Sequence, residues 1–285
     1  MRHNLLLFFF CLPSLVLSGC QFSQEKRDLD ESHDLKEWTK QETKVETSSI
    51  LTKEIKTLES GQWNKVWEDT FENLEQTDKK WNFIDKGNNY NNELQYYKKE
   101  NMKVMDGTLH IIGEKELYKG HPYTSGQINT LNKKHIEYGR IEIRAKHPAG
   151  KGLFPAIWLL PVDQTKGLPE IDIFEAIGNE PSQVYMVHHT GTIGNLNTTH
   201  DSFILNNINE FHDYALEWEE NELRWYIDNQ LRFVSRSGVP NEPMYLIINL
   251  AIGGDWPGDP NHLTAFPSSF DIDFVKVYEK VNEDE

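Results

Sequence analysis

The sequence predicts an all-β protein built as an antiparallel β-sandwich. From residue 63 onward, short segments that are apolar, or that alternate between apolar and polar residues, follow one another along the chain. Gly, Pro, Asn and Asp lie between these segments, and no long stretch has the 3.6-residue period of an amphipathic helix. Many short strands separated by polar turns are typical of two antiparallel sheets packed face to face. With 285 residues, the chain is long enough for one large domain with a sizeable core.

Residues 1–19 have the pattern of a bacterial lipoprotein signal peptide. Arg2 and His3 form a short polar head, and the mostly apolar run over residues 5–17 is too short to span a bilayer as a stable helix. The segment Leu17-Ser-Gly-Cys20 then resembles a lipobox, which implies cleavage before Cys20 and attachment of lipid to that residue. An ordinary secretory signal with an incidental cysteine is the alternative. A lipidated Cys20 would place the protein in the bacterial cell envelope, anchored in the outer membrane or at the cell surface.

Residues 20–60 are expected to form a polar linker, and residues 61–285 the folded domain. The linker mixes acids and bases and has few apolar residues, which favours a tether over a packed unit. The first folded segment is expected near Trp63. The predicted strands are residues 109–112, 139–145, 156–159, 184–189, 214–218, 223–227, 245–250 and 274–278. Polar residues 228–230 separate residues 223–227 from 231–234, which predicts a hairpin.

A further predicted strand contains three carboxylates. In Glu170-Ile-Asp-Ile-Phe-Glu175, the alternation of side chains along a strand places Glu170 and Asp172 on the same face. Glu175 has the opposite parity. It joins the other two acids only if the strand contains an extra residue, a β-bulge, between Asp172 and Glu175. Bulges are frequent beside active sites because they redirect a side chain.

Three carboxylates on one face repel one another, and a catalytic function would explain why the sequence keeps them together. Cleavage of a glycosidic bond needs two acids, one ionised and one protonated near neutral pH. Mutual repulsion raises the pKa of at least one member of such a cluster. Two alternatives stay open from this pattern alone: an exposed strand face on which acids happen to alternate, and a calcium site.

This acid strand resembles the catalytic signature of glycoside hydrolase family 16, in the six-residue bulged form that is typical of its laminarinase-like members. Other segments resemble further blocks of the family in the same order, so that the resemblance covers about residues 63–280. These segments are Asn92–Tyr97, Tyr138–Arg144, Gly152–Pro161, Phe211–Trp218 and Leu250–Gly258. The resemblance implies a β-jelly roll whose curved inner sheet forms a concave substrate cleft. It also implies an endo-acting hydrolase of β-1,3-glucan (laminarin-type) that retains the anomeric configuration.

The resemblance also implies roles for the residues around the acid strand. Glu170 would be the nucleophile, Glu175 the general acid/base, and Asp172 an assisting acid on the same face. His189 falls on the position of an active-site histidine of the family. Adjacent residues of a strand face opposite sides, so His188 is expected to point away from the site. A catalytic zinc ion is not expected because it would need three convergent ligands, and no other residues have that spacing.

Five further residues are expected to bind sugar. In the family, tryptophans at the positions of Trp158 and Trp256 stack on sugar rings, although burial in the core is the alternative for Trp158. Asn92, Gln95 and Arg144 resemble polar sugar contacts of the family, with turn capping or surface solvation as their alternative.

Many family members also bind a structural Ca²⁺ ion on the convex side, where it bridges the two chain ends. The matching positions are Glu68, the Gly107 carbonyl and Asp273, and oxygen ligands of this kind suit Ca²⁺. Ordinary turn acids are the alternative reading of these positions. No cofactor is expected for catalysis itself.

The composition limits the partners of the protein. The formal net charge is −16, which argues against nucleic acids and sulfated polymers and is compatible with a neutral polysaccharide. Both cysteines, Cys11 and Cys20, lie at the start of the chain, so the folded domain has neither a disulfide nor a cysteine metal site. The expected protein is a monomer that acts on neutral β-glucan and is held at the membrane through Cys20.

Two functions other than β-1,3-glucan hydrolysis, and one wider range of glucan substrates, also fit parts of this sequence. A galactan hydrolase, such as an agarase or a carrageenase, would use the same acids, although the negative charge argues against a sulfated substrate. A glucanase of this kind could also cleave mixed-linkage β-1,3-1,4-glucan. A non-catalytic glucan-binding protein on the same fold typically lacks one or both catalytic glutamates, whereas Glu170, Asp172 and Glu175 are all present here.

Overall fold

The computed structural model describes residues 63–87, 89–192 and 194–281. The predicted signal peptide, Cys20 and the polar linker lie outside the described residues. Within the described ranges, no helix has the length and apolar character that crossing a membrane would require.

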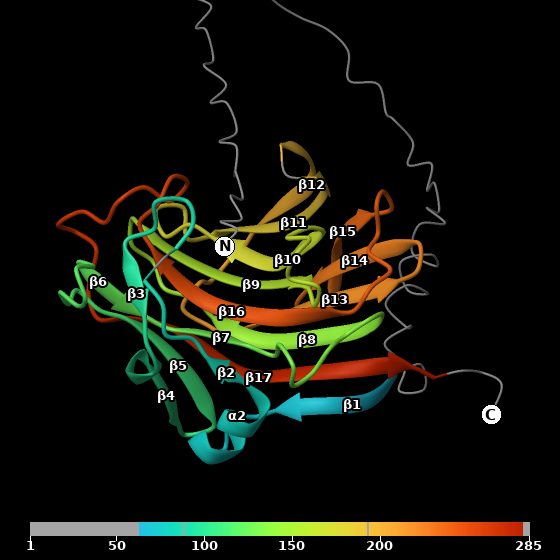
Figure 1. Cartoon of the computed structure of the whole chain (residues 1–285), viewed down its shortest axis with the longest axis horizontal. Helices are drawn as coiled ribbons and strands as arrows, with labels where there is room; N and C mark the ends of the chain where they lie inside the picture. Colours follow the sequence, from blue (N-terminus) through green and yellow to red (C-terminus); the bar gives the residue numbers. More distant parts are fainter. Residues whose placement is uncertain (1–62, 88, 193, 282–285) are drawn as a thin grey trace, which may run out of the picture. The chain divides into compact units, whose positions relative to one another are not determined.

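Two large antiparallel sheets form the domain, as the sequence predicts (Figure 1). The first, called sheet A below, has the strand order β15-β14-β13-β8-β17-β5-β4, and β1 also pairs with β17. Its strands are β1 (Trp63–Asp69), β4 (Met102–Met105), β5 (Thr108–Gly113), β8 (Gly139–Lys146), β13 (His212–Glu219), β14 (Glu222–Ile227), β15 (Gln230–Ser235) and β17 (Ser268–Lys280).

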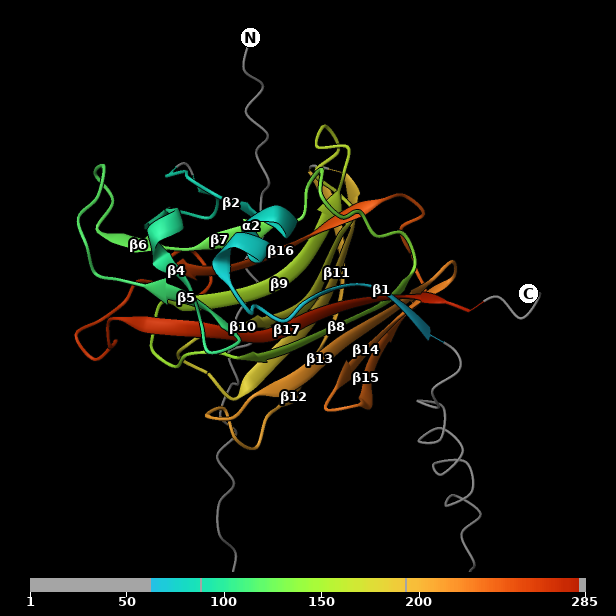
Figure 2. The same cartoon turned by 90° about the horizontal axis from the view of Figure 1, so that it is seen from below.

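The second sheet, called sheet B below, has the strand order β12-β11-β10-β9-β16-β7-β2. Its strands are β2 (Asn82–Phe83), β7 (Gln127–Asn129), β9 (Leu153–Pro161), β10 (Glu170–Ala176), β11 (Gln183–Thr192), β12 (Asn195–Ile204) and β16 (Met244–Ile252). The acid strand β10 therefore lies inside the sheet, between β9 and β11, as Figure 1 shows. Figure 2 shows the same two sheets from below. A small parallel pair, β3 (Gln95–Tyr97) and β6 (Tyr123–Ser125), lies apart from both sheets.

A hydrophobic core built from both sheets fills the sandwich, and β8 shows how the sequence specifies it. Ile141, Ile143 and Ala145 point into the core, while the alternate residues Glu142 and Arg144 are partly exposed. This period of two is the pattern of a strand that is covered on one face only. Each large apolar side chain buried in this way stabilises the fold by roughly 1.5–3 kcal/mol.

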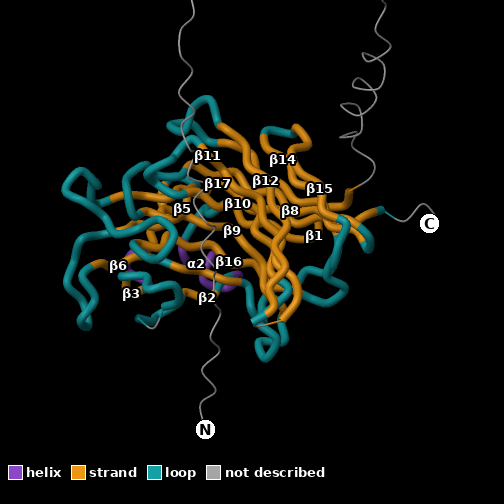
Figure 3. The backbone as a smooth tube through the Cα atoms, turned by 90° about the horizontal axis from the view of Figure 1, so that it is seen from above, coloured by secondary structure: helices purple, strands orange, loops and turns teal. Residues whose placement is uncertain are grey.

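Helical structure in the described part of the chain is confined to α2 (Leu74–Lys80) and the short 3₁₀ segment η2 (Lys99–Asn101) (Figure 3). Asn73 caps α2, because its side chain accepts a hydrogen bond of 3.0 Å from the backbone N–H of Gln76. The sequence did not predict this helix because 7 residues are too few to show a helical period.

All the strands predicted from the sequence form, and β14 and β15 form the predicted hairpin. One long strand, β12, was not predicted. Its sequence is polar and most of its residues are exposed, so it lacks the alternation that marks a half-buried strand. It forms because it pairs with β11 along its whole length, from Asn195 opposite Thr192 to Ile204 opposite Gln183. Pairing between strands here overrides a weak local preference.

Candidate active site

Strand β10 contains the predicted bulge. On the β11 side the register shifts between Asp172 and Glu175, and on the β9 side it shifts between Asp172 and Phe174. Ile173 and Phe174 both belong to the hydrophobic core, and Glu175 then returns to the opposite side of the sheet. The three acids thus share the face of sheet B that points away from the core. We call this surface the acid face.

Contacts with sheet A hold the bulge in place. Phe174 is fully buried, and its ring centroid lies 4.6 Å from that of Tyr214 and 5.7 Å from that of Phe270. Trp225 of β14 donates a hydrogen bond of 2.8 Å from its indole N–H to the backbone carbonyl of Asp172. A bulge disrupts the regular ladder locally, and a buried carbonyl without a partner would be costly. Trp225 supplies that partner from across the core.

The three acids are almost completely buried although they face away from the core. The exposed fraction is 3% for Glu170, 2% for Asp172 and 6% for Glu175. Burial raises the pKa of all three carboxyls, and the charge of Glu175 raises the pKa values of Glu170 and Asp172 further. Three such groups cannot all be ionised near neutral pH, so they share protons as one coupled set. An ionised nucleophile beside a protonated acid is the arrangement that glycosidic cleavage requires.

His189 of β11 lies beside these acids, as the sequence predicts. It is the cross-strand partner of Glu170, and its Nε2 atom lies 3.9 Å from Glu170 Oε1 and 3.7 Å from Asp172 Oδ2. Its Nδ1 atom lies 2.8 Å from the hydroxyl of Thr198, which fixes the plane of the ring. Burial lowers the pKa of His189 to about 4, with a further contribution from neighbouring histidines. The ring is therefore neutral at the pH at which the acids share their protons.

The neighbouring histidine faces the opposite side of the sheet, as predicted. His188 is fully buried, and its Nδ1 atom lies 3.1 Å from the hydroxyl of Ser235 on β15 of sheet A. Burial lowers the pKa of His188 to about 4, so this side chain is also neutral. It contributes to packing between the sheets and not to the acid face.

Glu170, Asp172 and His189 are the only His, Cys, Asp or Glu side chains that converge as a group of three or more in the described residues. One ligand atom from each lies within 4.8 Å of the others. Because burial raises the pKa of both carboxyls, a cation would have to displace protons to bind there. Catalysis without a metal ion stays a prediction.

Trp158 and Trp256 both lie at the acid face. Trp158 is the β9 partner of Asp172 and is partly exposed. Trp256 is 39% exposed, and its ring packs edge-on against Tyr185, the β11 partner of Glu175, with 5.0 Å between the ring centroids. These positions place one indole beside the middle acid and the other beside the last acid.

The two predicted polar contacts near β3 have different surroundings. Asn92 is exposed, and its amide donates a hydrogen bond of 2.8 Å to Asp255, beside Trp256. Gln95 is fully buried: it donates to Glu93 at 2.7 Å and accepts from the backbone N–H of Ile252 at 2.7 Å. The expectation that Gln95 contacts sugar directly is therefore wrong, because its polar atoms are used inside the protein.

The expectation for Arg144 is also wrong. Arg144 lies on β8 of sheet A, on the surface that faces away from the core, whereas the acids lie on sheet B. Its guanidinium forms ion pairs with Asp213 at 3.1 Å and with Asp273 at 3.2 Å. The alternation along β8 fixes which face Arg144 occupies, but the sequence does not reveal to which sheet β8 belongs.

Two of the three residues suggested for Ca²⁺, Glu68 and Asp273, are paired with cationic side chains. The carboxylate of Glu68 pairs with Lys65 at 2.6 Å, and the backbone carbonyl of Glu68 accepts a hydrogen bond of 2.7 Å from Lys80. The carboxylate of Asp273 pairs with Arg144 at 3.2 Å. Binding of Ca²⁺ through the carboxylates of Glu68 and Asp273 would require these exposed ion pairs to break. A bound Ca²⁺ ion stays a prediction.

Sequence reasoning missed three residues that orient side chains at the acid face: Thr198, Tyr97 and Asn249. Thr198 lies on the unpredicted strand β12 and had no recognisable signal. Asn249 had one, since it is a lone amide in the otherwise largely apolar strand β16. A buried amide needs hydrogen-bond partners, so its position alone indicated that polar groups converge there.

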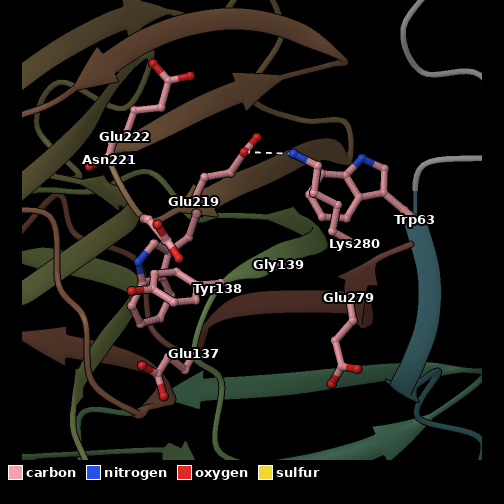
Figure 4. A pocket seen from close by; sticks show the side chains of 11 residues that line it. Trp63, Glu137, Tyr138, Gly139, Glu219, Asn221, Glu222, Glu279 and Lys280 are labelled. Carbon is pink, nitrogen blue, oxygen red and sulfur yellow. Dashed lines mark hydrogen bonds and ion pairs between the residues drawn. The ribbon is translucent and has the colours of Figure 1, made fainter. Parts of the chain in front are cut away.

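A separate cavity of about 520 Å³ lies along sheet A (Figure 4). It is lined by residues of β1, β13, β14 and β17 and of the turn before β8, including Trp63 and Tyr138. Glu219 pairs there with Lys280 at 2.8 Å, as Figure 4 shows. None of its lining residues belongs to β10, so this cavity is distinct from the acid face.

Comparison with known proteins identifies a matching family and several similar proteins. Residues 75–274 match the family described as glycosyl hydrolases family 16. The chain is 37% identical over 246 residues to a β-glucanase of Rhodothermus marinus, a match that covers 76% of this chain and 85% of that protein. It is 31% identical over 245 residues to a keratan-sulfate endo-1,4-β-galactosidase of Sphingobacterium multivorum, covering 78% of this chain and 56% of that protein.

The fold is also similar to that of solved structures. The laminarinase catalytic domain of Thermotoga maritima MSB8 superimposes with a TM-score of 0.71 and is 35% identical in sequence. The superposition covers 77% of this chain and 99% of that domain.

Proposed function

Because the chain belongs to glycosyl hydrolases family 16, we propose that it is an endo-acting glycosidase that hydrolyses β-1,3-linked glucan of the laminarin type. One observation carries the proposal: the bulge in β10 brings Glu175 to the face that holds Glu170 and Asp172. Similarity to a β-glucanase and a laminarinase supports glucan as the substrate class. Mixed-linkage β-1,3-1,4-glucan belongs to the proposed range of substrates.

Family 16 is a retaining family, so the reaction has two displacement steps. In the first step, Glu170 attacks the anomeric carbon and forms a glycosyl–enzyme bond, while Glu175 donates its proton to the departing oxygen. In the second step, Glu175 accepts a proton from water, the water oxygen attacks the anomeric carbon, and Glu170 leaves as a carboxylate. Two inversions at the same carbon retain its configuration.

The pKa values of Glu170 and Glu175 are both raised to about 8, so one carboxyl can be ionised while the other keeps its proton. The assignment of Glu170 as the nucleophile rests on membership of the family. Burial and the charges of both glutamates raise the pKa of Asp172, so Asp172 keeps its proton when Glu170 is ionised. A protonated Asp172 can donate a hydrogen bond to the Glu170 carboxylate and stabilise it as nucleophile and as leaving group. The neutral ring of His189 adds no positive charge that would lower the pKa of the acid Glu175.

The partly exposed aromatic rings support binding of a neutral sugar chain. Trp158 lies beside Asp172, and Trp256 lies beside Tyr185, so both indoles flank the acids along the sheet. Sugar rings have apolar faces that pack on such surfaces, and neutral hydroxyl groups are not repelled by a chain with a net charge of −16.

Release of reducing sugar from laminarin tests the proposal. The parent protein is expected to release it, and Glu170→Gln is expected to lower kcat/KM on the order of 10³-fold or more, because it removes the nucleophile. A loss of less than about tenfold would mean that Glu170 does not attack the substrate. The amide variant has nearly the same size, so circular dichroism should show an unchanged fold.

A galactan hydrolase is the second candidate, favoured by the similarity to an endo-1,4-β-galactosidase. That enzyme would use the same acids, and only the sugar contacts would differ. A panel of laminarin, lichenan, agar, carrageenan and keratan sulfate separates the candidates. Faster release from agar or keratan sulfate than from laminarin would exclude the glucanase assignment.

We also propose that Cys20 anchors the protein to the bacterial cell envelope. The support is the lipobox-like sequence Leu17-Ser-Gly-Cys20 after a short apolar run. Cys20→Ser is expected to move the protein from the membrane fraction to the soluble fraction or to block its processing. Equal amounts of parent and variant in the membrane fraction would contradict this anchor.

A further inference from the structure

Asn249 is a buried polar residue at the centre of sheet B. In β16 it pairs with Ala156 of β9 on one side and with Gln127 of β7 on the other. Its side chain is only 5% exposed, so a substrate on the acid face has little access to it. A buried amide that contributes nothing else would destabilise the core, and its role must lie in the groups it contacts.

Both ends of the Asn249 amide form hydrogen bonds. The oxygen Oδ1 accepts a bond of 2.7 Å from the indole N–H of Trp158, and the nitrogen Nδ2 donates a bond of 3.2 Å to the hydroxyl of Tyr97. An indole N–H is only a donor, so the amide oxygen must face Trp158. The nitrogen must then face Tyr97, and the orientation of the amide is fixed.

Tyr97 is itself held rigidly. Its side chain is 2% exposed, and its backbone N–H and carbonyl form a pair of hydrogen bonds with Lys86, of 2.8 and 3.0 Å. Two residues earlier in β3, the buried Gln95 bonds to the backbone of Ile252 at the end of β16. The hydroxyl of Tyr97 is therefore a fixed point that is tied to the same strand as Asn249.

Trp158 needs such support because part of its ring is not enclosed by the protein. It is partly exposed on the acid face, where it pairs with Asp172. Packing alone fixes a partly exposed ring less firmly than a buried one, and a hydrogen bond at its N–H selects one orientation. Building on the proposed function, we propose that Asn249 is a positioning residue: it holds the indole of Trp158 as a platform for the sugar beside Asp172.

Steady-state kinetics on laminarin test the consequence for the substrate. Asn249→Leu has about the same size and removes both hydrogen bonds. It is expected to raise KM about tenfold with a smaller change in kcat, because a sugar platform binds ground state and transition state alike. The pH profile should not move, because the acids are untouched. Asn249→Asp keeps an oxygen for Trp158 and an oxygen for the Tyr97 hydroxyl, and is expected to restore KM to within about threefold of the parent.

Exchange of the Trp158 indole proton in ¹⁵N-labelled full-length protein tests the hydrogen bond directly. The signal is assigned by its absence in Trp158→Phe. It is expected to exchange slowly in the parent and in Asn249→Asp, and at least about tenfold faster in Asn249→Leu. Tyr97→Phe removes only the second bond and is expected to give intermediate exchange and an intermediate KM.

Asn101→Leu is the matched control. Asn101 is a buried amide whose nitrogen donates to the carbonyl of Ile112 at 2.7 Å and to the hydroxyl of Thr124 at 3.1 Å. This variant is expected to lose stability as Asn249→Leu does, but to keep the parent KM and the parent exchange rate at Trp158.

Three results would overturn the proposal: unchanged KM and exchange in Asn249→Leu, failure of Asn249→Asp to restore either, or an equal rise of KM in the control. If Asn249→Leu does not fold, Tyr97→Phe decides, and parent values for both readouts overturn the proposal. If the parent does not hydrolyse laminarin, the proposed function fails, while indole exchange still reports whether Asn249 holds Trp158.

Discussion

The nucleophile Glu170 is expected to destabilise the folded protein at neutral pH, and Glu170→Gln should relieve this cost. Burial, followed by the charge of Glu175, raises the pKa of Glu170 from 4.5 to about 8 in the folded state. Because the pKa of Glu170 is higher in the folded than in the unfolded state, the contribution of this carboxyl to the free energy of unfolding is fully present below the unfolded pKa. It is lost as the pH rises through the folded pKa. Because pH 7.5 lies about three units above the unfolded pKa of 4.5, the loss of stability there is at most ~4 kcal/mol at 1.36 kcal/mol per unit. Proton sharing with Asp172 reduces this figure, since the loss belongs to the coupled set.

Thermal unfolding at pH 4.5 and pH 7.5 measures this effect. The glutamine side chain does not titrate, so the variant and the parent should unfold at similar temperatures at pH 4.5. At pH 7.5 the variant should unfold several degrees higher, because ~1 kcal/mol corresponds to about 2–4 °C for a domain of this size. The exposed residue Glu100 provides the control, and Glu100→Gln should not change the difference between the two pH values. If Glu170→Gln has the same effect at both pH values, or is less stable than the parent at pH 7.5, the reasoning about burial is refuted.

Five further predictions rest on the same geometry. Glu175→Gln should lower laminarin hydrolysis by about 10²–10⁴-fold, because it removes the proton donor. A dinitrophenyl β-glycoside has a leaving group that needs no proton, so it should still glycosylate the variant at nearly the parent rate, as measured by stopped-flow release of dinitrophenol. An equal loss of rate on both substrates would contradict the acid role of Glu175. In Glu175→Gln the glycosylation rate should persist to lower pH, because the charge that raises the pKa of Glu170 is gone. An unchanged acidic side of the pH–rate profile would argue against coupling between Glu170 and Glu175. Trp256→Ala should raise KM for laminarin about tenfold with little change in kcat, and an unchanged KM would remove this indole from the binding surface. Arg144→Ala should leave kcat/KM within about twofold, because Arg144 lies on sheet A; a larger loss would contradict that placement. Phe174→Ala should cost about 3–5 kcal/mol of stability in denaturant unfolding and lower activity by loosening the bulge, whereas a cost below about 1 kcal/mol would show that the bulge does not depend on this ring.

The acid strand shows what alternation alone can predict. Parity along residues 170–175 required a bulge if Glu175 was to join Glu170 and Asp172, and the register shift lies between Asp172 and Glu175. The same rule separated His188 from His189. These predictions succeeded because the period of a strand is a local property that the sequence states directly.

Predictions failed where the answer depends on which distant strands pair. Arg144 was assigned to the acid face, but the pairing of β8 with β13 and β17 places it on sheet A. Gln95 was assigned to sugar binding, but the approach of β3 to the end of β16 buries it against Ile252. No local pattern encodes these contacts, because they join segments far apart in the sequence. The partial exception is Asn249, whose isolation in an apolar strand signals a buried partner without identifying it.

The most direct test of the central claim is to trap the covalent intermediate. A 2-deoxy-2-fluoro β-laminaribiosyl fluoride combines a good leaving group with a fluorine that slows the second step, so that the glycosyl–enzyme accumulates. We predict that mass spectrometry of the digested protein finds one fluorosugar, attached to the peptide at Glu170, and that Glu170→Gln gives no adduct. An adduct on Asp172 or Glu175, or turnover of laminarin by a protein that never forms an adduct at Glu170, would contradict the account.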